Sequence, residues 1–345
     1  MQMQAAFIHG HGGNEVVSVG PRPVPPRPAG HVLVRLHAAT VNRVDLYMRD
    51  SGAGITHQLP QTMGLDGAGT VEAVDADERL LQVGQSVVVH PGLVCGRCEF
   101  CQRGEGVVCV HMRLLGEHCA GTCAQYVSVP AHNVFPMPSG LSFVEAAALG
   151  VNHLTAWRML FTKAQLKPWE TVLVFGIGGG VSLAALQLAK LAGARVIVTS
   201  RDDSKLAKAL AMGADHAING QATDVAKAVL AATGGRGVDV VFENVGAAVW
   251  SSAMKSLVRG GRLVTCGATT GDQPPADLRR IFIRQLQILG STLGDFNEFR
   301  DLLGFVERSG LKPVIDSTYP LAQVHAALDR LASGQQFGKV AMHID

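Results

Sequence analysis

The most informative segment for the fold class is residues 172–201, VLVFGIGGGVSLAALQLAKLAGARVIVTSR. Its first four residues predict an apolar strand, the glycines after them a tight turn, residues 182–192 a helix, and RVIVTS at 195–200 the next strand. In this order the elements begin a parallel α/β unit, where the turn and the helix N-terminus present backbone N–H groups to a pyrophosphate. The segment therefore predicts a dinucleotide-binding domain.

The glycine motif itself is imperfect, so its placement carries the prediction. Counted from Gly176 the last glycine position holds Val181, and counted from Ile177 it holds Ser182. A glycine-rich turn without a ligand is the alternative, but a position between a strand and a helix favours cofactor binding. The residues predicted to contact the cofactor here are Gly178, Gly179, Gly180 and Val181.

The pattern extends on both sides of this unit. After it, apolar runs at 238–244, 261–267 and 286–292 alternate with helical stretches, which is typical of a parallel sheet covered on both faces. Before it, short apolar runs broken by Gly and Pro predict a second, strand-rich region. Because 345 residues exceed the usual size of one domain, we expect an α/β protein with two cores.

Composition excludes several classes of function. Apolar residues make up 47 % of the chain and charged residues 17 %, with a net charge of +2, as in a folded globular protein. No run of Lys and Arg marks a nucleic-acid surface, and no stretch of 18 apolar residues marks a membrane span. The start, MQMQAAFIHG, lacks the basic and apolar regions of a secretion signal, so we expect a cytoplasmic protein.

The end of the second strand indicates the type of nucleotide. An NAD site places Asp or Glu there, whereas an NADP site offers small polar and basic groups. Here the strand ends at Ser200 and Arg201 follows, with Lys205 one turn into the next helix. Asp202 and Asp203 come one step late and are expected to cap that helix. The sequence therefore favours NADP(H), with NAD as the alternative.

Four cysteines form a run in CGRCEFCQRGEGVVC, at Cys95, Cys98, Cys101 and Cys109. Their spacing lets one loop surround a tetrahedral ion, and four thiolates make a coordinatively closed site, so we predict one structural Zn²⁺. An iron–sulfur cluster and free or disulfide-bonded thiols are the alternatives. Outside this run, Cys119 and Cys123 have too few further ligands nearby to predict a metal, so they are expected to be small buried thiols.

The cysteine run, the glycine unit near residue 175 and the closing GKVAMHI (338–344) together resemble the medium-chain dehydrogenase/reductase superfamily. The resemblance implies a GroES-like, partly open β-barrel catalytic domain plus a Rossmann domain with a doubly wound parallel sheet. The expected boundaries are 1–154 for the catalytic domain with a zinc loop at 92–112, 155–291 for the Rossmann domain, and 292–345 for a C-terminal return. It also implies a homodimer or homotetramer.

Alcohol dehydrogenases of this superfamily hold a second, catalytic zinc, and here the chain departs from them. The three ligand positions are occupied by Asn42, Leu65 and Val151, and Val44 replaces the hydroxyl that relays a proton. Amide and aliphatic side chains are not zinc ligands, so no catalytic zinc is expected. His57 and His153 are conceivable substitute ligands, but lone imidazoles are more often surface or pocket residues.

The replacements match another branch of the superfamily. Asn42, Val44, Asp45 and Tyr47 resemble the N-x-V-D-x-Y pattern of quinone oxidoreductases and enone reductases, and NHLTA at 152–156 resembles their N-x-L-T-A segment. The resemblance implies NADPH-dependent hydride transfer to an activated C=C bond or a quinone, with a small-molecule substrate. The alternatives are an alcohol dehydrogenase or carbonyl reductase, and a non-catalytic NADPH-binding protein.

This resemblance also implies roles for individual residues. Asn42 and Asn152 would be amide donors and Tyr47 a donor or proton source, with a scaffold role as the alternative for each. Asp45 is expected to orient neighbouring backbone rather than accept protons, and Asp66 to be a buried, hydrogen-bonded scaffold group. The remaining predicted cofactor contacts are Arg43, Thr155, Gly246, Gly267, Ala268 and Lys339, for the last of which a surface position is the alternative.

Overall fold

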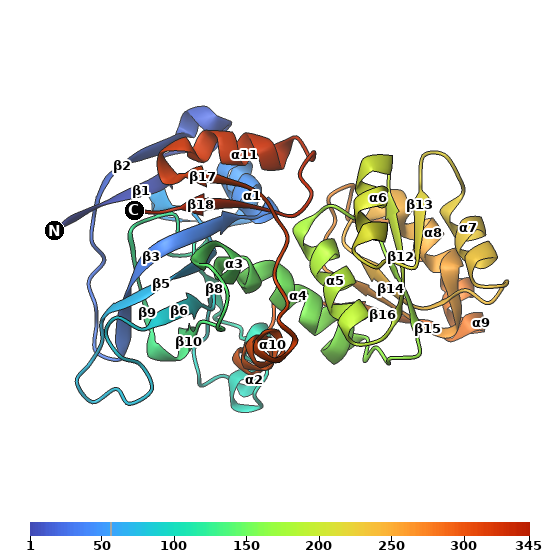
Figure 1. Cartoon of the computed structure of the whole chain (residues 1–345), viewed down its shortest axis with the longest axis horizontal. Helices are drawn as coiled ribbons and strands as arrows, with labels where there is room; N and C mark the ends of the chain where they lie inside the picture. Colours follow the sequence, from blue (N-terminus) through green and yellow to red (C-terminus); the bar gives the residue numbers. More distant parts are fainter. Residues whose placement is uncertain (56) are drawn as a thin grey trace. The chain divides into compact units, whose positions relative to one another are not determined.

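The computed structural model describes residues 1–55 and 57–345, which divide into two compact units (Figure 1). Unit 1 comprises Met1–Leu154 and Gly294–Asp345, and unit 2 comprises Thr155–Leu293. Unit 2 is therefore an insertion in the sequence of unit 1. None of the described helices has the length and apolar character that a bilayer crossing requires.

Unit 2 contains a six-stranded sheet in the order β13-β12-β11-β14-β15-β16, and all neighbouring strands in it are parallel. Its strands are β11 (Thr171–Val174), β12 (Arg195–Ser200), β13 (His216–Asn219), β14 (Val238–Glu243), β15 (Leu257–Thr265) and β16 (Gln287–Gly290). Its main helices are α5 (Gly180–Leu191), α6 (Asp203–Ala211), α7 (Val225–Ala232), α8 (Ala247–Ser256) and α9 (Leu278–Arg284). This is the doubly wound order of a dinucleotide-binding sheet, which confirms the predicted fold class.

The central strands of unit 2 are buried along their whole length because helices cover both of their faces. Every residue of β11 and β14 is buried, and Leu173, Ile197 and Val241 lie in one apolar core with residues of the covering helices. The strand β13 was not among the strands predicted from sequence. Its four residues, HAIN, lack the apolar run that revealed its neighbours.

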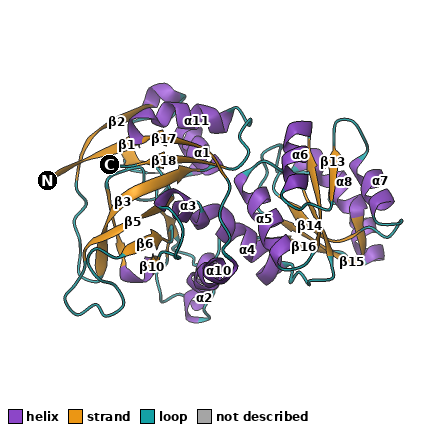
Figure 2. Cartoon of the chain, in the orientation of Figure 1, coloured by secondary structure: helices purple, strands orange, loops and turns teal. Residues whose placement is uncertain are grey.

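Unit 1 is mostly β-structure, and Figure 2 shows its strands in orange. A seven-stranded sheet has the order β10-β6-β5-β3-β18-β17, with β9 also paired to β3; the other sheets are β2-β1-β4 and β7-β8. The strands are β1 (Gln2–Ile8), β2 (Val17–Pro23), β3 (His31–Val41), β4 (Gln61–Thr62), β5 (Asp66–Ala73), β6 (Ser86–Val89), β7 (Gly92–Leu93), β8 (Arg113–Leu114), β9 (Tyr126–Pro130), β10 (Val134–Pro136), β17 (Ile315–Pro320) and β18 (Lys339–His343).

The helices of unit 1 lie around these sheets (Figure 2). They are α1 (Arg43–Ser51), α2 (Glu99–Gln102), α3 (Phe143–Ala147), α10 (Phe296–Ser309) and α11 (Val324–Ala332), with short turns η1 (Asn14–Val16), η2 (Gly52–Gly54), η3 (Gly106–Val108), η4 (Ala131–Asn133) and η7 (Leu321–Gln323). The helical run predicted from Glu145 is present, but it contains two π-helical stretches, η5 (Leu149–His153) and η6 (Arg158–Lys163), on either side of α4 (Leu154–Trp157). Such turns are frequent at functional sites, and η5 contains Asn152.

The long strand β3 brings the two ends of unit 1 together. It pairs with β5 on one side and with the C-terminal strand β18 on the other, with Val340 opposite Val41. Its alternating residues Val32, Val34 and Leu36 are buried in the main core of the unit. This register places Lys339 beside the end of β3, where α1 begins.

Candidate functional site

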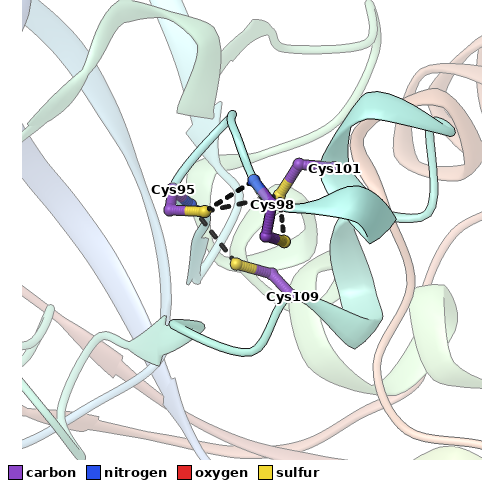
Figure 3. Close-up of side chains that lie close together, drawn as sticks. All are labelled: Cys95, Cys98, Cys101 and Cys109. Carbon is purple, nitrogen blue, oxygen red and sulfur yellow. Dashed lines mark hydrogen bonds between the residues drawn. The ribbon is translucent and has the colours of Figure 1, made fainter.

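The four-cysteine loop brings its sulfur atoms together, as Figure 3 shows. All four Sγ atoms lie within 4.8 Å of one another, and the Cys98–Cys101 and Cys95–Cys101 separations are 3.5 Å and 4.0 Å. A tetrahedral Zn²⁺ with Zn–S bonds of about 2.3 Å requires S···S separations of about 3.8 Å. The arrangement therefore fits a structural zinc site, with Cys95, Cys98, Cys101 and Cys109 as the residues that would hold the ion.

Backbone N–H groups around this loop stabilise thiolates. The amide of Cys98 donates to the sulfur of Cys95, and the amides of Cys95 and His111 donate to the sulfur of Cys109, each at 3.4 Å. Backbone hydrogen bonding also lowers the pKa of Cys98 to about 6. These backbone hydrogen bonds favour the thiolate form that binds a cation.

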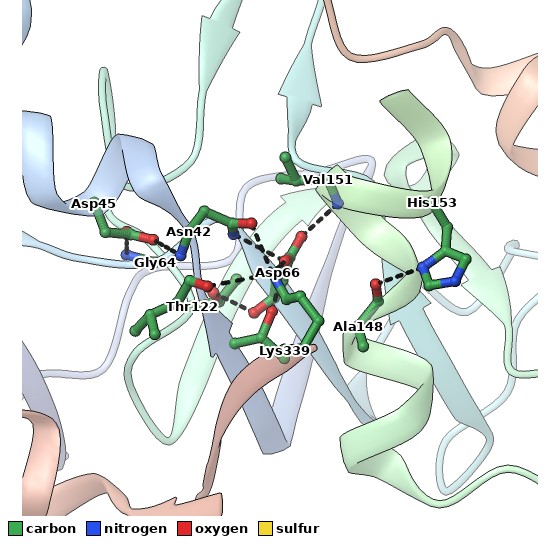
Figure 4. A network of polar contacts seen from close by, with 11 residues as sticks. Asn42, Asp45, Gly64, Asp66, Thr122, Ala148, Val151, His153 and Lys339 are labelled. Carbon is green, nitrogen blue, oxygen red and sulfur yellow. Dashed lines mark hydrogen bonds and ion pairs between the residues drawn. The ribbon is translucent and has the colours of Figure 1, made fainter. Parts of the chain in front are cut away.

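A second polar cluster lies at the end of β3, and Asp66 is at its centre (Figure 4). Its carboxylate is fully buried and accepts hydrogen bonds from the Thr40 hydroxyl at 2.6 Å and the Asn42 amide at 2.9 Å, both to Oδ2. The backbone amide of Val151 donates to Oδ1 at 2.6 Å. Asp66 thus connects α1, the main sheet and the π-helical turn η5, which is the scaffold role expected for it.

Lys339 completes this cluster and is not a surface lysine, so that alternative is wrong. It is 3 % exposed, and its ammonium pairs with Asp66 Oδ2 at 3.0 Å. It also donates to Asn42 Oδ1 at 2.7 Å and to the Val41 carbonyl at 3.3 Å, which uses all three of its N–H bonds. In this structure Lys339 is therefore engaged inside unit 1, and its predicted contact with a cofactor stays a prediction.

The positions of the catalytic zinc ligands of alcohol dehydrogenases surround the same cluster. Asn42 is bonded to Asp66 and Lys339, Leu65 is buried and apolar, and Val151 contributes only its backbone amide. Among residues 1–55 and 57–345, the four-cysteine loop is the only group of three or more potential ligands close enough to hold a metal. A catalytic zinc does not fit these side chains.

The three predicted catalytic side chains differ in how they are bonded. The amide of Asn42 is 5 % exposed and used within the cluster, which favours the scaffold role for it. The amide of Asn152 is 8 % exposed and has no hydrogen-bond partner among the described residues. Tyr47, on α1, has 40 % of its surface exposed. Asn152 and Tyr47 are therefore the members of the trio that remain available to a ligand.

Two carboxyl groups beside the cluster carry raised pKa values. Burial raises the pKa of Asp45 to about 7, against hydrogen bonds from the backbone amides of Asn42 at 2.7 Å and Gly64 at 3.1 Å. Burial, and next the charge of Asp45, also raises the pKa of Glu117 to about 7. Asp45 has the backbone-organising role expected of it, whereas Glu117 was missed because no motif in the sequence marks it.

The conceivable substitute ligands and the other thiols have ordinary structural positions. His57 Nδ1 bonds the Glu117 carbonyl at 3.0 Å, and His153 Nδ1 bonds the Ala148 carbonyl at 3.2 Å. Cys123 is 1 % exposed and Cys119 is half-buried, and burial raises the pKa of Cys119 to about 11. Among the described residues, none of these four belongs to a group that could hold a metal.

In unit 2 the glycine turn follows β11 and ends at the first residue of α5, Gly180. Gly178 has φ of +110°, and a Cβ atom there would lie 2.7 Å from the Lys205 side chain. Ser182, at one of the two final motif positions, is buried and donates to the Phe175 carbonyl at 2.8 Å. Its small side chain lets α5 pack closely on the sheet, so the imperfect motif keeps the geometry of a phosphate-binding turn.

Small polar and basic residues follow the second strand of the sheet, and one of them lies beside this turn. Ser200 is the last residue of β12 and Arg201 follows it, exposed. The Lys205 ammonium lies 3.3 Å from the ideal Cβ position of Gly178. Asp202 caps α6 through the amides of Ser204 and Lys205, as predicted, so its carboxylate is already used. The structure therefore places the Lys205 side chain beside the turn, and β12 ends in Ser200 and not in a carboxylate.

A buried carboxylate that the sequence did not reveal organises the next loop. Glu243, the last residue of β14, accepts from the amides of Val245 at 2.5 Å and Gly246 at 2.6 Å and from the Thr265 hydroxyl at 2.9 Å. Gly246 has φ of +97° and packs against Ala268, and Gly267 packs against Asn244. These predicted contact residues therefore meet at the carboxyl edge of the sheet, while Thr155 lies in α4, 6 % exposed.

The chain combines a doubly wound parallel sheet and its glycine turn with a β-rich unit that contains a four-cysteine loop. Together these features are typical of a dinucleotide-dependent oxidoreductase that carries a structural metal site. Two families match this chain: "Alcohol dehydrogenase GroES-like domain" over residues 28–139 and "Zinc-binding dehydrogenase" over residues 180–308.

Relatives extend this match over nearly the whole chain. A zinc-type alcohol dehydrogenase-like protein of Schizosaccharomyces pombe is 35 % identical, covering 92 % of this chain and 91 % of the relative. The quinone oxidoreductase of Rattus norvegicus is 30 % identical, covering 99 % and 97 %. A solved NAD-dependent alcohol dehydrogenase is 41 % identical with a TM-score of 0.96, covering 99 % and 100 %. The chain belongs to the medium-chain dehydrogenase/reductase superfamily.

Proposed function

We propose that this oxidoreductase uses NADPH to reduce an activated C=C bond or a quinone, without a catalytic zinc. The observation that carries the proposal is the cluster around Asp66, where alcohol dehydrogenases hold their working metal. The Lys339 ammonium already neutralises Asp66, and Asn42, Leu65 and Val151 offer no metal ligand. A divalent cation there would meet a fixed positive charge and no anionic partner of its own.

Without a Lewis acid, we expect the enzyme to reduce acceptors that are activated by conjugation. The bound dinucleotide supplies a hydride, and an acceptor conjugated to a carbonyl takes it at the β-carbon while the charge moves to oxygen. That oxygen needs a hydrogen-bond donor, and the unpartnered amide of Asn152 is the group we assign to it. The Tyr47 hydroxyl is then the proton source for the enolate. A saturated ketone would lack the Lewis acid that polarises its carbonyl in a zinc-dependent enzyme.

NADPH is proposed because of the basic side chains that follow β12. Arg201 and Lys205 suit a 2′-phosphate, and Ser200 stands where an NAD site has a carboxylate. One solved relative is called NAD-dependent, so both nucleotides belong in the assay. A reducing compartment such as the cytoplasm would keep the four thiols of the zinc loop available for their metal.

The test is an oxidation screen with NADPH and NADH over quinones, enones, 2-alkenals and saturated aldehydes, with zinc counted on the same preparation. We expect turnover of conjugated acceptors and one Zn²⁺ per chain. Rapid turnover of a saturated aldehyde together with two Zn²⁺ per chain would support an alcohol dehydrogenase instead. Binding of NADPH with no turnover of any acceptor would support a non-catalytic protein.

Variants separate the two proposed roles. Asn152→Ala should lower kcat/KM for an enone by about 100-fold, in the range found for loss of one donor to a developing oxyanion. Tyr47→Phe should lower kcat and change its pH dependence, whereas Tyr126→Phe, at another tyrosine of unit 1, should leave both unchanged. Unchanged kinetics in both Asn152→Ala and Tyr47→Phe would contradict the assignment of roles.

We also propose that the protein is a homo-oligomer that associates through the edge of the unit 2 sheet. Among the described strands only β15 pairs with β16, whose Ile288 is 37 % exposed. Leu278 and Phe282 of the neighbouring α9 are 71 % and 68 % exposed. An unpaired edge with apolar neighbours is suited to association. Light scattering should give a dimer or tetramer, and Ile288→Lys should shift it toward monomer.

A further inference from the structure

A second polar site lies in unit 2, at the opposite edge of the sheet from the glycine turn. It is a hollow of about 590 Å³ lined by residues just before β11, around the start of β14, within β15 and at the end of α9. Glu170 directly precedes β11, whereas the glycine turn directly follows that strand. We call it the arginine hollow, after its lining residues Arg236, Arg259, Arg262 and Arg284.

The arginine hollow carries an excess of positive charge. Four guanidinium groups face two carboxylates, Glu170 and Asp239, which leaves a net charge of +2. Glu170 pairs with Arg262 at 2.5 Å and Asp239 pairs with Arg236 at 2.6 Å, so both acids are already engaged. Burial would raise the pKa of Asp239, but hydrogen bonds from Arg236 and the Thr171 amide, together with the charge of Arg236, lower it.

The other two arginines have no carboxylate partner among the described residues. Arg259 donates to the Ile283 carbonyl at 3.2 Å, and Arg284 donates to the Leu257 carbonyl at 3.1 Å. A neutral carbonyl orients a guanidinium without neutralising its charge, and each group keeps further N–H donors. In addition, the buried Nε of Arg262 has no hydrogen-bond partner in the part of the chain that the structure describes. The hollow thus combines uncompensated charge with an unused buried donor, which is unusual in a folded protein.

We propose that the arginine hollow is a second anion-binding site, distinct from the nucleotide site, and that it takes a phosphoryl group. Phosphate carries about −1.5 to −2 charges near pH 7, which matches the excess of +2. Planar guanidinium groups bind its oxygens in pairs, and a concave surface concentrates their field. The volume is within the range of small-molecule sites, so the hollow accommodates inorganic phosphate, pyrophosphate or a small phosphorylated metabolite.

The test is calorimetric titration of pyrophosphate into the full-length protein at constant ionic strength, with NADPH saturating so that the glycine turn cannot bind the probe. We expect one pyrophosphate per chain, and weaker binding of inorganic phosphate with its single phosphoryl group. The variant Arg259→Gln/Arg284→Gln should bind at least tenfold more weakly. Its glutamine amides can still donate to the two backbone carbonyls, which keeps the local structure.

The matched control is Lys255→Gln/Arg279→Gln, which removes two exposed positive charges from the same unit outside the hollow. It should bind pyrophosphate within twofold of the wild type. Equal loss in both double variants would show a general charge effect and overturn the proposal, as would no binding to the wild type. Malonate binding as tightly as pyrophosphate would overturn the assignment to a phosphoryl group.

A thermal measurement keeps the test decisive if the double variant is unstable. Phosphate stabilises folded proteins in general, so only the difference between variants is informative. Pyrophosphate at ten times its dissociation constant should raise the Tm of the wild type and of the control by the same few degrees. Single variants Arg259→Gln and Arg284→Gln should each lose part of that rise, and an undiminished rise in both would contradict the site.

Discussion

Replacing Lys339 by methionine should destabilise unit 1, because it leaves a buried carboxylate without its cation. Lys339 and Asp66 are 3 % and 0 % exposed at a separation of 3.0 Å. Breaking such a pair by removing one partner costs about 3–5 kcal/mol. Asp66 keeps its hydrogen bonds from Thr40, Asn42 and Val151, so the lower end, about 3 kcal/mol, is expected.

Urea unfolding measures this cost, and the aromatic residues let the unfolding of unit 2 be followed separately. All three tryptophans, at 157, 169 and 250, lie in unit 2, whereas all three tyrosines lie in unit 1. Far-UV circular dichroism would therefore follow the whole chain while tryptophan emission follows unit 2. With a slope of about 3 kcal/mol per molar urea, the dichroism midpoint of Lys339→Met should fall by about 1 M.

A double-mutant cycle decides whether charge is the cause. In Lys339→Met/Asp66→Asn neither charge remains, so the double variant should be less destabilised than the sum of the single variants by about 2 kcal/mol or more. Lys312→Met is the control, because its ion pair with Glu145 is 60 % exposed at the lysine and should contribute less than about 1 kcal/mol. A Lys339→Met midpoint equal to that of Lys312→Met, or strictly additive single effects, would refute the reasoning.

Three further predictions concern the metal, the nucleotide and pH. Cys109→Ser should abolish zinc in elemental analysis and lower the Tm, since a structural zinc contributes folding free energy; a full zinc content would contradict the ligand assignment. Ser200→Asp should lower kcat/KM for NADPH relative to NADH by at least about tenfold, because its carboxylate repels a 2′-phosphate, and an unchanged ratio would argue against NADP(H). The pKa of Asp45 is raised to about 7, so its contribution to the free energy of unfolding is complete below about pH 4 and is lost as the pH rises through 7. Relative to Asp45→Asn, the free energy of unfolding of the wild type should fall by about 2–3 kcal/mol between pH 5 and 8. Parallel plots of unfolding free energy against pH for the two proteins would contradict this.

Much of unit 2 could be predicted because its determinants are local. Strand β11 is almost continuously apolar, and the glycines after it supply positive φ angles that other residues adopt only with strain. The four-cysteine loop is local as well, because 15 consecutive residues contain all four thiols. Strand β13 escaped prediction because HAIN has no period or apolar run of its own and is fixed by pairing with β12.

The fold class, the four-cysteine loop and the glycine turn could be read from the sequence, since each depends on residue type at a short spacing. The bonding among polar side chains became visible in the tertiary structure alone. The tertiary structure joined Lys339 to Asn42 across 297 residues, left the Asn152 amide without a partner among the described residues, and buried Glu243. It also gathered Arg236, which precedes β14, Arg259 and Arg262 of β15, and Arg284 at the end of α9. The groups that bury a polar side chain or compensate its charge are distant in the chain. Strand register and packing, and not the local sequence pattern, therefore determine whether such a side chain is buried and paired.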